Sequence, residues 1–496
     1  MTDSESLRRR TVLRAVGTGL AGVAAGSGVA AGAPARDAES DVSEAGVDRR
    51  AQVTTTAGDG SDGDGGDEPV ADGNTWRQFQ ADATNSGHSA ATGPRSGTVA
   101  WTYDTGEPNE SLPTPTATAT RSSDDYAGVL SSPAVVDGVV YVGSTDGSVY
   151  ALDAASGEER WSVATGDGVL SSPAVVDGVV YVGSHDQTLY ALDAASGDEE
   201  WTFDADGNVF SSPTYHDGAV YVGSQAGTTY AVDAASGDEL WASSTGQRVD
   251  ATPAVVDGQV YVGYYRPDNQ GGIRALDADN GSEVWTLETN GAVPCSPTVA
   301  DGVLYVGDYG GAVYALDTAS GDGIWALTLS DWVLSSPVVV DGTVYVAGYD
   351  ETVWAFTAGR GPDAGSTEWS YDVGASVLSS PAVADGVLYV GSSDHRLHAV
   401  DIEAQEALFT VETSQQVFSS PAVTDGAVFV GSNDSLVYAI TEDGEAPSTT
   451  PTPTPTETPT TTGNGPGFGP MAGLAGLGLG VWSRLRGGDD PDGDDR

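Results

Sequence analysis

The chain has 496 residues, with 72 Asp and Glu against 19 Lys and Arg, and a formal net charge of −53. So acidic a surface repels the phosphates of nucleic acids and anionic membranes. We therefore expect no nucleic acid partner, and membrane contact only through a carboxy-terminal anchor. All 19 cations are Arg, and the composition is typical of a salt-loving archaeon, in which 1 M salt screens charges over about 3 Å. The charge therefore says nothing about the substrate.

The amino-terminal segment has the pattern of an export signal. Arg9 and Arg10 precede a weakly apolar run, and Ala-x-Ala sites lie at 31–33 and 33–35. Residues 1–35 therefore resemble a twin-arginine signal peptide, which serves proteins that fold before export. Residues 36–75 are rich in Gly and Asp, and we predict an acidic disordered linker there.

One phrase then occurs eight times. Its first copy reads Ser131-Ser132-Pro133, then Asp137-Gly138, then Tyr141-Val142-Gly143 and, further on, Trp161. The Ser-Ser-Pro segment starts at 131, 171, 211, 251, 295, 335, 379 and 419, in steps of 40 or 44 residues, and reads Ala-Thr-Pro at 251 and Cys-Ser-Pro at 295. A fixed period of this length indicates a repeat architecture.

Each copy is predicted to form four short strands, which in the first copy are 131–136, 139–144, 148–153 and 158–164. Asp137-Gly138 marks a tight hairpin, because Gly accepts the positive φ that such a turn needs. Four strands every 40 residues are typical of a propeller blade, and no helical periodicity appears in residues 95–441. The structural alternative is a linear β-solenoid, which would use shorter coils and capping ends.

The aromatic residue of the fourth strand distinguishes a ring from a line. It occurs seven times, at Trp161, Trp201, Trp241, Trp285, Trp325, Trp369 and Phe409. The missing eighth copy lies near the amino terminus, at Trp101 in the run 99–103. We therefore predict an all-β, eight-bladed propeller over residues 76–441, closed when the strand near Trp101 completes the last blade. These eight aromatics are expected to dock one blade against the next.

The run from Ala151 to Trp161, Ala-Leu-Asp-Ala-Ala-Ser-Gly-Glu-Glu-Arg-Trp, resembles the repeat of pyrroloquinoline-quinone-like (PQQ-like) propellers. The lead-in from Trp76 to Gly87 resembles the segment that opens many of these domains. The superfamily includes quinoprotein alcohol dehydrogenases and the outer-membrane assembly factor BamB. The resemblance implies the fold strongly and the activity weakly, because function depends on the site.

No catalytic or metal-binding residue is predicted. The resemblance to quinoprotein dehydrogenases implies a vicinal Cys pair beside the quinone, and this chain has one Cys, Cys295. The five His residues show no spacing typical of metal ligands. We therefore expect no cofactor, and lean against an enzyme; PQQ and calcium belong only to the alternative of a quinoprotein oxidoreductase.

A candidate binding patch emerges where blades 4 to 6 depart from the repeat. The departures fall before the Ser-Ser-Pro segment and after the second strand, in loops expected to share one face. They are Arg248, Asp250, Tyr264, Tyr265, Arg266, Asp308, Tyr309, Trp332 and Tyr349. Aromatic platforms with a few polar groups suit sugars, peptides or a planar cofactor. The alternative is that the aromatics cover a longer loop and that Arg248 and Asp250 form a local ion pair.

The carboxy-terminal part has the pattern of a surface anchor. Residues 446–464 are mostly Thr and Pro and are predicted to form a stalk. Pro466, Gly467 and Phe468 open a segment, 466–486, that resembles a PGF-type sorting signal, and an acidic tail, 487–496, follows. Sequons at Asn109, Asn280 and Asn433 are candidate glycosylation sites.

The hypothesis is a secreted, monomeric propeller that is anchored at the cell surface. It would serve as a non-catalytic binding or protein-assembly module for a protein, peptide or glycan.

Overall fold

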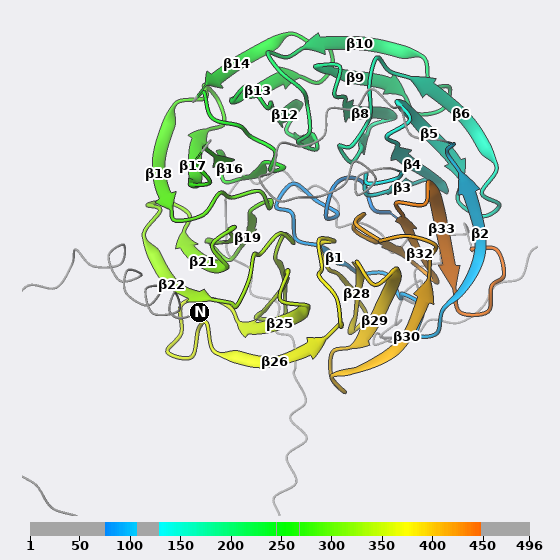
Figure 1. Cartoon of the computed structure of the whole chain (residues 1–496). Coiled ribbons are helices and arrows are strands. Elements are labelled where there is room, and N and C mark those ends of the chain that lie inside the picture. The colour runs from blue at the N-terminus through cyan, green and yellow to red at the C-terminus, as the bar shows by residue number, and fades with distance from the viewer. Residues whose placement is uncertain (1–74, 107–127, 245, 267, 448–496) are drawn as a thin grey trace, which may run out of the picture. The chain divides into compact units, whose positions relative to one another are not determined.

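The computed structural model describes residues 75–106, 128–244, 246–266 and 268–447, and these contain β-structure and no helix. Eight sheets of at least four strands surround a central axis (Figure 1). The prediction of an all-β, eight-bladed propeller is therefore confirmed. The predicted signal peptide, sorting segment and tail, with nearly all of the linker and stalk, lie outside the described residues. Within those residues, no helix is long and apolar enough to cross a membrane.

Each blade runs from an inner strand at the axis to an outer strand at the rim. Blades 1 and 2 comprise β3 (Ala134–Val136), β4 (Val139–Gly143), β5 (Ser148–Asp153), β6 (Glu159–Ala164), β7 (Ala174–Val176), β8 (Val179–Gly183), β9 (Thr188–Asp193) and β10 (Glu199–Asp204). Blades 3 and 4 comprise β11 (Thr214–His216), β12 (Ala219–Gly223), β13 (Thr228–Asp233), β14 (Glu239–Ser244), β15 (Ala254–Val256), β16 (Gln259–Tyr265), β17 (Gly271–Asp277) and β18 (Glu283–Thr289).

The second half of the ring repeats this order. Blades 5 and 6 comprise β19 (Thr298–Ala300), β20 (Val303–Gly307), β21 (Ala312–Asp317), β22 (Gly323–Thr328), β23 (Val338–Val340), β24 (Thr343–Ala347), β25 (Thr352–Thr357) and β26 (Thr367–Asp372). Blades 7 and 8 comprise β27 (Ala382–Ala384), β28 (Val387–Ser392), β29 (Arg396–Asp401), β30 (Glu406–Glu412), β31 (Ala422–Thr424), β32 (Ala427–Gly431), β33 (Leu436–Thr441) and, from the amino-terminal end, β2 (Thr98–Asp104).

The first hairpin of a blade follows the predicted turn. In blade 1, Val136 pairs with Val139 across Asp137 and Gly138, whose φ angles are 50° and 71°. Two positive φ angles belong to a type I′ turn, which matches the twist of paired strands. The prediction that this strand starts at 131 is wrong, because β3 begins at Ala134. The two Ser residues ahead of it hydrogen-bond elsewhere, through a hydroxyl and a backbone amide.

The ring closes through the amino-terminal strand, as predicted. β2 pairs antiparallel with β33, and this pairing places Trp101 opposite Ala439 and Tyr103 opposite Val437. The Nε1–H group of Trp101 donates to the carbonyl of Ala154 in blade 1 at 3.0 Å. The two ends of the propeller therefore build one blade together, and that blade docks onto the first.

The aromatic residues of the outer strands lie between neighbouring blades. The Nε1–H group of Trp161 donates to the carbonyl of Ala194 in the next blade at 3.0 Å, and its ring packs on Tyr141 at 5.9 Å between centroids. The same kind of hydrogen bond to the next blade recurs at Trp201, Trp241, Trp285 and Trp325. At Trp369 and Phe409 the ring packs on Tyr345 and Tyr389.

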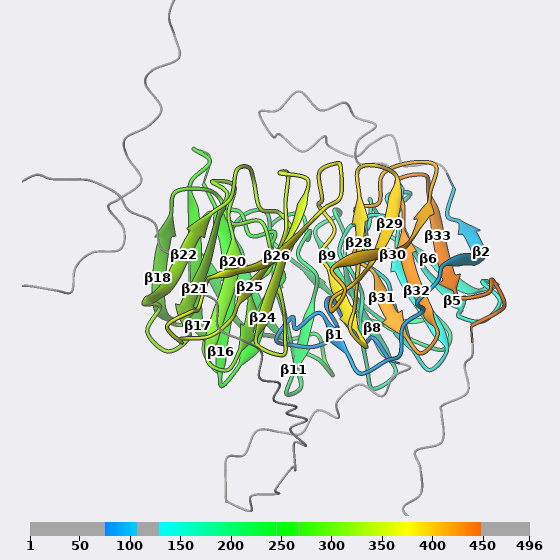
Figure 2. The ribbon, with the colours of Figure 1, turned by 90° about the horizontal axis from the view of Figure 1, so that it is seen from below.

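The segment ahead of β2 covers one end of the ring, which we call the base. The N–H groups of Val175 and Val255, in the inner strands of blades 2 and 4, donate to the carbonyls of Arg77 and Ala83 at 2.7 Å. β1 (His88–Ser89) then adds parallel to β27 as a fifth strand of that sheet. Figure 2 shows this blue segment along one face of the propeller. The segment therefore closes the central channel at the base.

The opposite end, which we call the mouth, carries the loops between blades and those between the second and third strands. In blade 1 the N–H of Thr145 donates to the carbonyl of Gly128 at 3.1 Å, which joins these two kinds of loop. Residues 107–127, which precede the first blade, lie outside the described part of the chain.

Two of the sequons lie on described residues. Asn280 is exposed, whereas Asn433 is 6% exposed. Asn109 lies outside the described part. Of the two described sites, only Asn280 is therefore accessible for a glycan in the folded protein.

Candidate functional site

A cavity of about 280 Å³ lies on the axis of the ring. Phe79 of the base segment lines one end, and the mouth residues Asn269 and Tyr309 line the other. Because the base segment closes the channel, a ligand reaches this cavity from the mouth. Every blade contributes side chains to the wall at two levels along the axis. Because the blades repeat, equivalent residues lie at the same level.

The upper level is a ring of mostly apolar side chains, which we call the apolar ring. It comprises Leu130, Leu170, Phe210, Asp250, Pro294, Leu334, Leu378 and Phe418. Blade 4 differs from the others because it contributes a carboxylate. The upper level is thus a hydrophobic collar with one charged position.

The lower level, two residues further along each segment, is a ring of hydroxyls, which we call the serine belt. It comprises Ser132, Ser172, Ser212, Thr252, Ser296, Ser336, Ser380 and Ser420. Seven hydrogen bonds link neighbouring members of the belt. In each, the backbone N–H of one belt residue donates to the hydroxyl oxygen of the equivalent residue in the next blade, at 2.9–3.0 Å. The last bond joins Ser420 to Ser132, so the belt spans the junction where the ring closes.

A cluster of three residues occupies the charged position of the apolar ring. Arg248 holds Asp250 through two hydrogen-bonded contacts, Nε to Oδ1 at 2.8 Å and Nη2 to Oδ2 at 2.6 Å. The hydroxyl of Tyr265 donates to Oδ2 of the same carboxylate, and its ring lies 4.9 Å from the guanidinium carbon of Arg248. The cluster therefore combines a bidentate ion pair with a cation–π contact.

The surroundings of this cluster keep Tyr265 and Arg248 in fixed protonation states. Burial and the negative charge of Asp250 raise the pKa of the Tyr265 hydroxyl well above its usual value. Burial opposes the charge on Arg248, but the carboxylate of Asp250 outweighs it and raises the pKa of the guanidinium. Tyr265 is therefore a neutral donor and Arg248 a permanent cation. The carboxylate is already bound by both, which makes it a poor general base.

Four aromatic rings continue from this cluster across the mouths of blades 4, 5 and 6, and we call them the aromatic arc. Ring centroids lie 6.4 Å apart for Tyr265 and Tyr309, 5.2 Å for Tyr309 and Trp332, and 5.3 Å for Trp332 and Tyr349. Their planes are tilted by 49° to 56°. All four side chains are partly exposed, so the arc offers ring faces and edges to a ligand.

Three residues of the predicted patch lie apart from this assembly. Tyr264 is 2% exposed and packs in the core between blades. Arg266 pairs with Glu288 at 2.5 Å on the outer side of the loop. Asp308 is fully buried, and it accepts N–H bonds from its own turn and a bond from Tyr314. The structure therefore brings together six of the nine predicted residues.

His185 is a mouth residue that the sequence reasoning missed. It occupies in blade 2 the position of Tyr309 in blade 5, and its ring packs on Phe210 of the apolar ring at 5.8 Å. It is 8% exposed, and neither ring nitrogen has a hydrogen-bond partner among the described residues. Burial lowers the pKa of its imidazole, so the ring stays neutral and apolar in character. The sequence did offer a signal for this residue, because His185 departs from the repeat at the same position as Tyr309.

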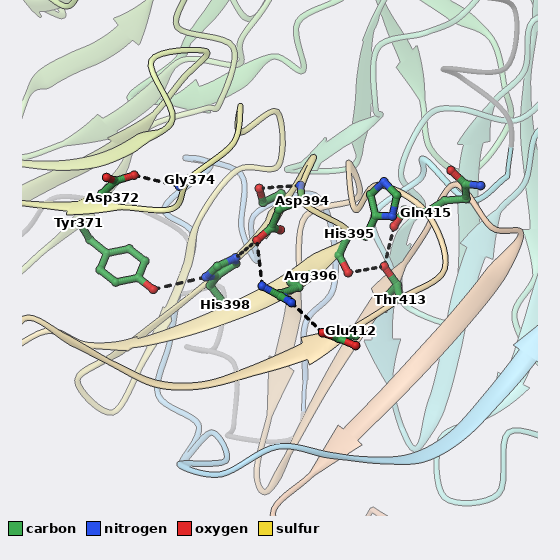
Figure 3. A network of polar contacts seen from close by, with 11 residues as sticks. Tyr371, Asp372, Gly374, Asp394, His395, Arg396, His398, Glu412, Thr413 and Gln415 are labelled. Atoms are coloured by element: carbon green, nitrogen blue, oxygen red, sulfur yellow. Dashed lines mark hydrogen bonds and ion pairs between the residues drawn. The ribbon is translucent and has the colours of Figure 1, made fainter.

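Blade 7 contains a polar network that could be mistaken for a catalytic site (Figure 3). Nε2 of His398 lies 2.9 Å from Asp394 Oδ2, and Nδ1 lies 3.4 Å from the hydroxyl of Tyr371. The equivalent residues in blade 2 are Tyr190 and Asp186, and the hydroxyl of Tyr190 donates to the Asp186 carboxylate at 2.7 Å. The contact is thus a repeated brace of the mouth loop. The His in blade 7 replaces a Tyr in a structural role.

Cys295 lies just below Pro294 and takes the place of a Ser in the repeat. Its Sγ contacts both the N–H and the carbonyl of Gly307 at 3.1 Å. Burial raises the pKa of the thiol to about 12. A thiol that remains protonated is a weak nucleophile, so Cys295 has the properties of a core residue.

The cavity does not offer a calcium site. Ca²⁺ takes six to eight oxygen ligands, usually with several carboxylates. Asp250 is the one carboxylate in the cavity wall, and it is bound to a permanent cation. Within the described ranges, no group of three or more His, Cys, Asp or Glu side chains could hold a metal ion. The residues present therefore do not fit a calcium-bound quinone.

Two protein families match the sequence. The family described as the outer membrane protein assembly factor BamB matches residues 85–265. The family described as the beta-propeller of beta-alanine-activating enzyme matches residues 214–463, about half of the chain. The chain belongs to this beta-propeller family. Among curated proteins, none matches the sequence of this family member.

Solved structures agree on the fold of this beta-propeller. BamB from Moraxella catarrhalis is 20% identical, with a TM-score of 0.55, and covers 70% of this chain and 99% of its own. Quinohemoprotein alcohol dehydrogenase from Comamonas testosteroni is 17% identical, with a TM-score of 0.61 and coverages of 76% and 82%. A europium-containing methanol dehydrogenase is 15% identical, with a TM-score of 0.61 and coverages of 74% and 98%. The propeller is therefore similar in fold to these proteins and, over residues 85–265, in sequence to the BamB family, while its archaeal origin and terminal signals stay predictions.

Proposed function

We propose that this protein is a non-catalytic binding module that holds its ligand at the mouth of the central cavity, over blades 4 to 6. The observation that carries the proposal is the asymmetry of the mouth. Seven blades line the upper level with apolar residues, and one places a paired carboxylate there, directly beside the aromatic arc.

The chemistry of the mouth supports binding better than catalysis. Asp250 is neutralised by Arg248, Tyr265 stays protonated, and the thiol of Cys295 is buried. None of these groups is a free nucleophile or base. Exposed aromatic faces with a few fixed polar groups are instead typical of ligand recognition.

The proposal includes export by the twin-arginine route and attachment at the cell surface, where the partner would be a protein, a peptide or a glycan. The export and attachment parts of the proposal rest on the sequence patterns of residues 1–35 and 466–486. Because the chain is similar to the assembly factor BamB, a protein client is one of these possible partners. The quinoprotein dehydrogenases of similar fold supply the competing function, an oxidoreductase.

One experiment with two arms tests the proposal. In the first, the purified full chain is mixed with PQQ, Ca²⁺ and an alcohol, and reduction of an electron-accepting dye is followed. We expect no reduction above that of a heat-unfolded sample. Alcohol-dependent reduction would establish the oxidoreductase and overturn the proposal.

In the second arm, immobilised glycan and peptide arrays are probed with the wild-type chain and with Trp332→Ala. Trp332 is partly exposed, so its loss should leave the fold intact, and Leu240→Ala on an exposed outer strand serves as the control. We expect Trp332→Ala to lose the array signal and Leu240→Ala to keep it. Equal signals from both variants would place binding elsewhere and contradict the proposal.

A further inference from the structure

The serine belt lies deeper in the cavity than the aromatic arc and has a chemistry of its own. Seven of its eight hydroxyl oxygens, all but that of Thr252, accept a backbone N–H bond, and none of the belt's hydroxyl protons has an acceptor among the described residues. The belt residues are 2% to 7% exposed, and they line the cavity, which is where this remaining surface lies. A ring of hydroxyl groups that can still donate a hydrogen bond therefore surrounds the axis.

This donor ring differs from the other serines of the repeat. Ser171, the residue before the belt in blade 2, both donates to the carbonyl and accepts from the N–H of Gly183, at 2.7 and 2.8 Å. Its hydrogen-bonding capacity is used inside the blade. The seven belt serines accept one N–H bond each and donate none within the described residues. Accepting an N–H bond polarises the O–H bond and strengthens it as a donor.

The charge of the surroundings selects against ions. The one cation of the cavity wall, Arg248, is matched by Asp250, so the wall carries no net charge. An anion would find this cation already held by the Asp250 carboxylate. A cation, in turn, would find no free carboxylate in the wall, because Asp250 is the one carboxylate there and it is paired with Arg248. A neutral ligand with oxygen acceptors meets neither obstacle.

The levels above the belt specify the rest of the ligand. The apolar ring and the aromatic arc would contact C–H groups, whereas the belt would contact oxygens. A volume of about 280 Å³ is near the lower end of the range of small-molecule sites, which starts at roughly 300 Å³. The ligand must therefore be small and carry both C–H faces and oxygens.

We propose that the serine belt is the inner binding level of the cavity and that its ligand is a small neutral polyhydroxy compound, a saccharide or a polyol. The inference rests on the proposed function, because it extends the same site from the mouth into the channel. It narrows the ligand class and adds a depth at which the ligand sits.

The test uses isothermal titration calorimetry of the full chain with five named probes. Glucose, maltose and glycerol are neutral, citrate is anionic, and glycine betaine is a zwitterion with a quaternary ammonium group. We expect at least one neutral polyhydroxy probe to bind at millimolar concentration, and citrate and betaine not to bind. Preferred binding of citrate or betaine, or the absence of any binding, would overturn the inference.

Two pairs of variants locate the bound probe. Ser336→Ala removes one belt hydroxyl, and Ser336→Thr keeps it, as Thr252 does in blade 4. Loss of one hydrogen bond predicts a roughly 3- to 10-fold weaker affinity for Ser336→Ala and near wild-type affinity for Ser336→Thr. Leu334→Trp narrows the apolar ring above the belt and should abolish binding, whereas the same change at the exposed Leu240 should not.

The pattern of results separates the two proposals. Binding that depends on Trp332 but is unchanged in Leu334→Trp and Ser336→Ala would confine the ligand to the mouth; the proposed function would stand and the inner level would fall. Binding that ignores Trp332 as well would remove both. Melting temperatures of all variants within a few degrees of the wild type are required, and Ser336→Thr supplies the comparison if Ser336→Ala fails to fold.

Discussion

Asp250 is the residue at which the wall of the cavity departs furthest from the repeat. Six blades place Leu or Phe at this position, whereas blade 4 buries a carboxylate and pairs it with Arg248. A buried ion pair is often no more stabilising than apolar residues of similar volume. Its presence therefore favours a role in binding over a role in stability.

Restoring the repeat at both positions tests that distinction. We expect Arg248→Asn with Asp250→Leu, the residues of blades 3 and 1, to change the free energy of unfolding by no more than about 1 kcal/mol. Asp250→Leu alone leaves the guanidinium without its partner and should cost about 1–3 kcal/mol, because Arg248 is only partly exposed. Urea denaturation at fixed salt measures both. A double variant as unstable as the single one would make the pair a requirement of folding.

Cys295 gives a second prediction at this scale. Burial raises the pKa of its thiol to about 12 from 9.0, so the folded state holds the proton more tightly than the unfolded state. Its contribution to stability is complete below pH 9 and is lost as the pH rises through the folded-state pKa. We expect iodoacetamide to label the thiol at pH 8 only after unfolding, as read by mass spectrometry. Rapid labelling of the native protein would contradict its burial.

Neighbouring residues show where sequence reasoning stops. Tyr264 and Tyr265 both depart from the repeat, but strand alternation turns the first into the core and the second to the cavity. Asp308 replaces a Ser and anchors its own turn. Repeat departures therefore identify positions but not side-chain directions, which depend on packing between blades.

At the scale of the element, the turns were predictable because their residues have few alternatives. Asp137 and Gly138 adopt positive φ angles, as Asp-Gly predicts. The start of the inner strand was not predictable in the same way. Ser131 and Ser132 directly precede the inner strand in the sequence. However, the Ser131 hydroxyl bonds within blade 1 and the Ser132 amide bonds to blade 2, so neither residue joins the strand ladder.

Gly157 tests how tightly the outer strands dock. Its φ is +71°, and a Cβ there would lie 2.6 Å from the ring of Trp101 in the adjoining blade. Gly178 has a φ of +83° but no atom within 4 Å of such a Cβ, which makes it a matched control. Gly178→Ala should lower the free energy of unfolding by about 1–2 kcal/mol through the backbone alone. Gly157→Ala should cost a further 1–3 kcal/mol, roughly, through overpacking.

Chemical denaturation of the two variants at one salt concentration gives the comparison. Because both changes add the same methyl group at a positive φ, the difference between them isolates the contact with Trp101. Equal losses for Gly157→Ala and Gly178→Ala would mean that the aromatic does not press against the turn.

At the scale of the whole molecule, the ring was predictable from counting. Seven fourth-strand aromatics for eight inner segments required an eighth, and Trp101 supplies it across more than 300 residues of sequence. The blind cavity was not predictable, since it depends on the base segment reaching blades far apart in the chain. The packing of His185 on Phe210 was likewise not predictable, although its departure from the repeat could have placed it at the mouth.

Hydrogen exchange tests the closure of the ring. β2 pairs with β33 as β6 pairs with β5, so their amides should be equally protected. We expect peptides covering 98–104 and 159–164 to exchange at rates within about tenfold of each other under native conditions. Much faster exchange in residues 98–104 would show that the amino-terminal strand is not held in the last blade.

At the same scale, the central proposal is that a closed propeller presents a non-catalytic binding cavity at its mouth. A crystal structure of the full chain purified from its own cells tests this most directly. We predict a small neutral molecule between the aromatic arc and the serine belt. A calcium-bound quinone in that place, or a cavity that holds only water while a ligand is bound on another face, would contradict the account.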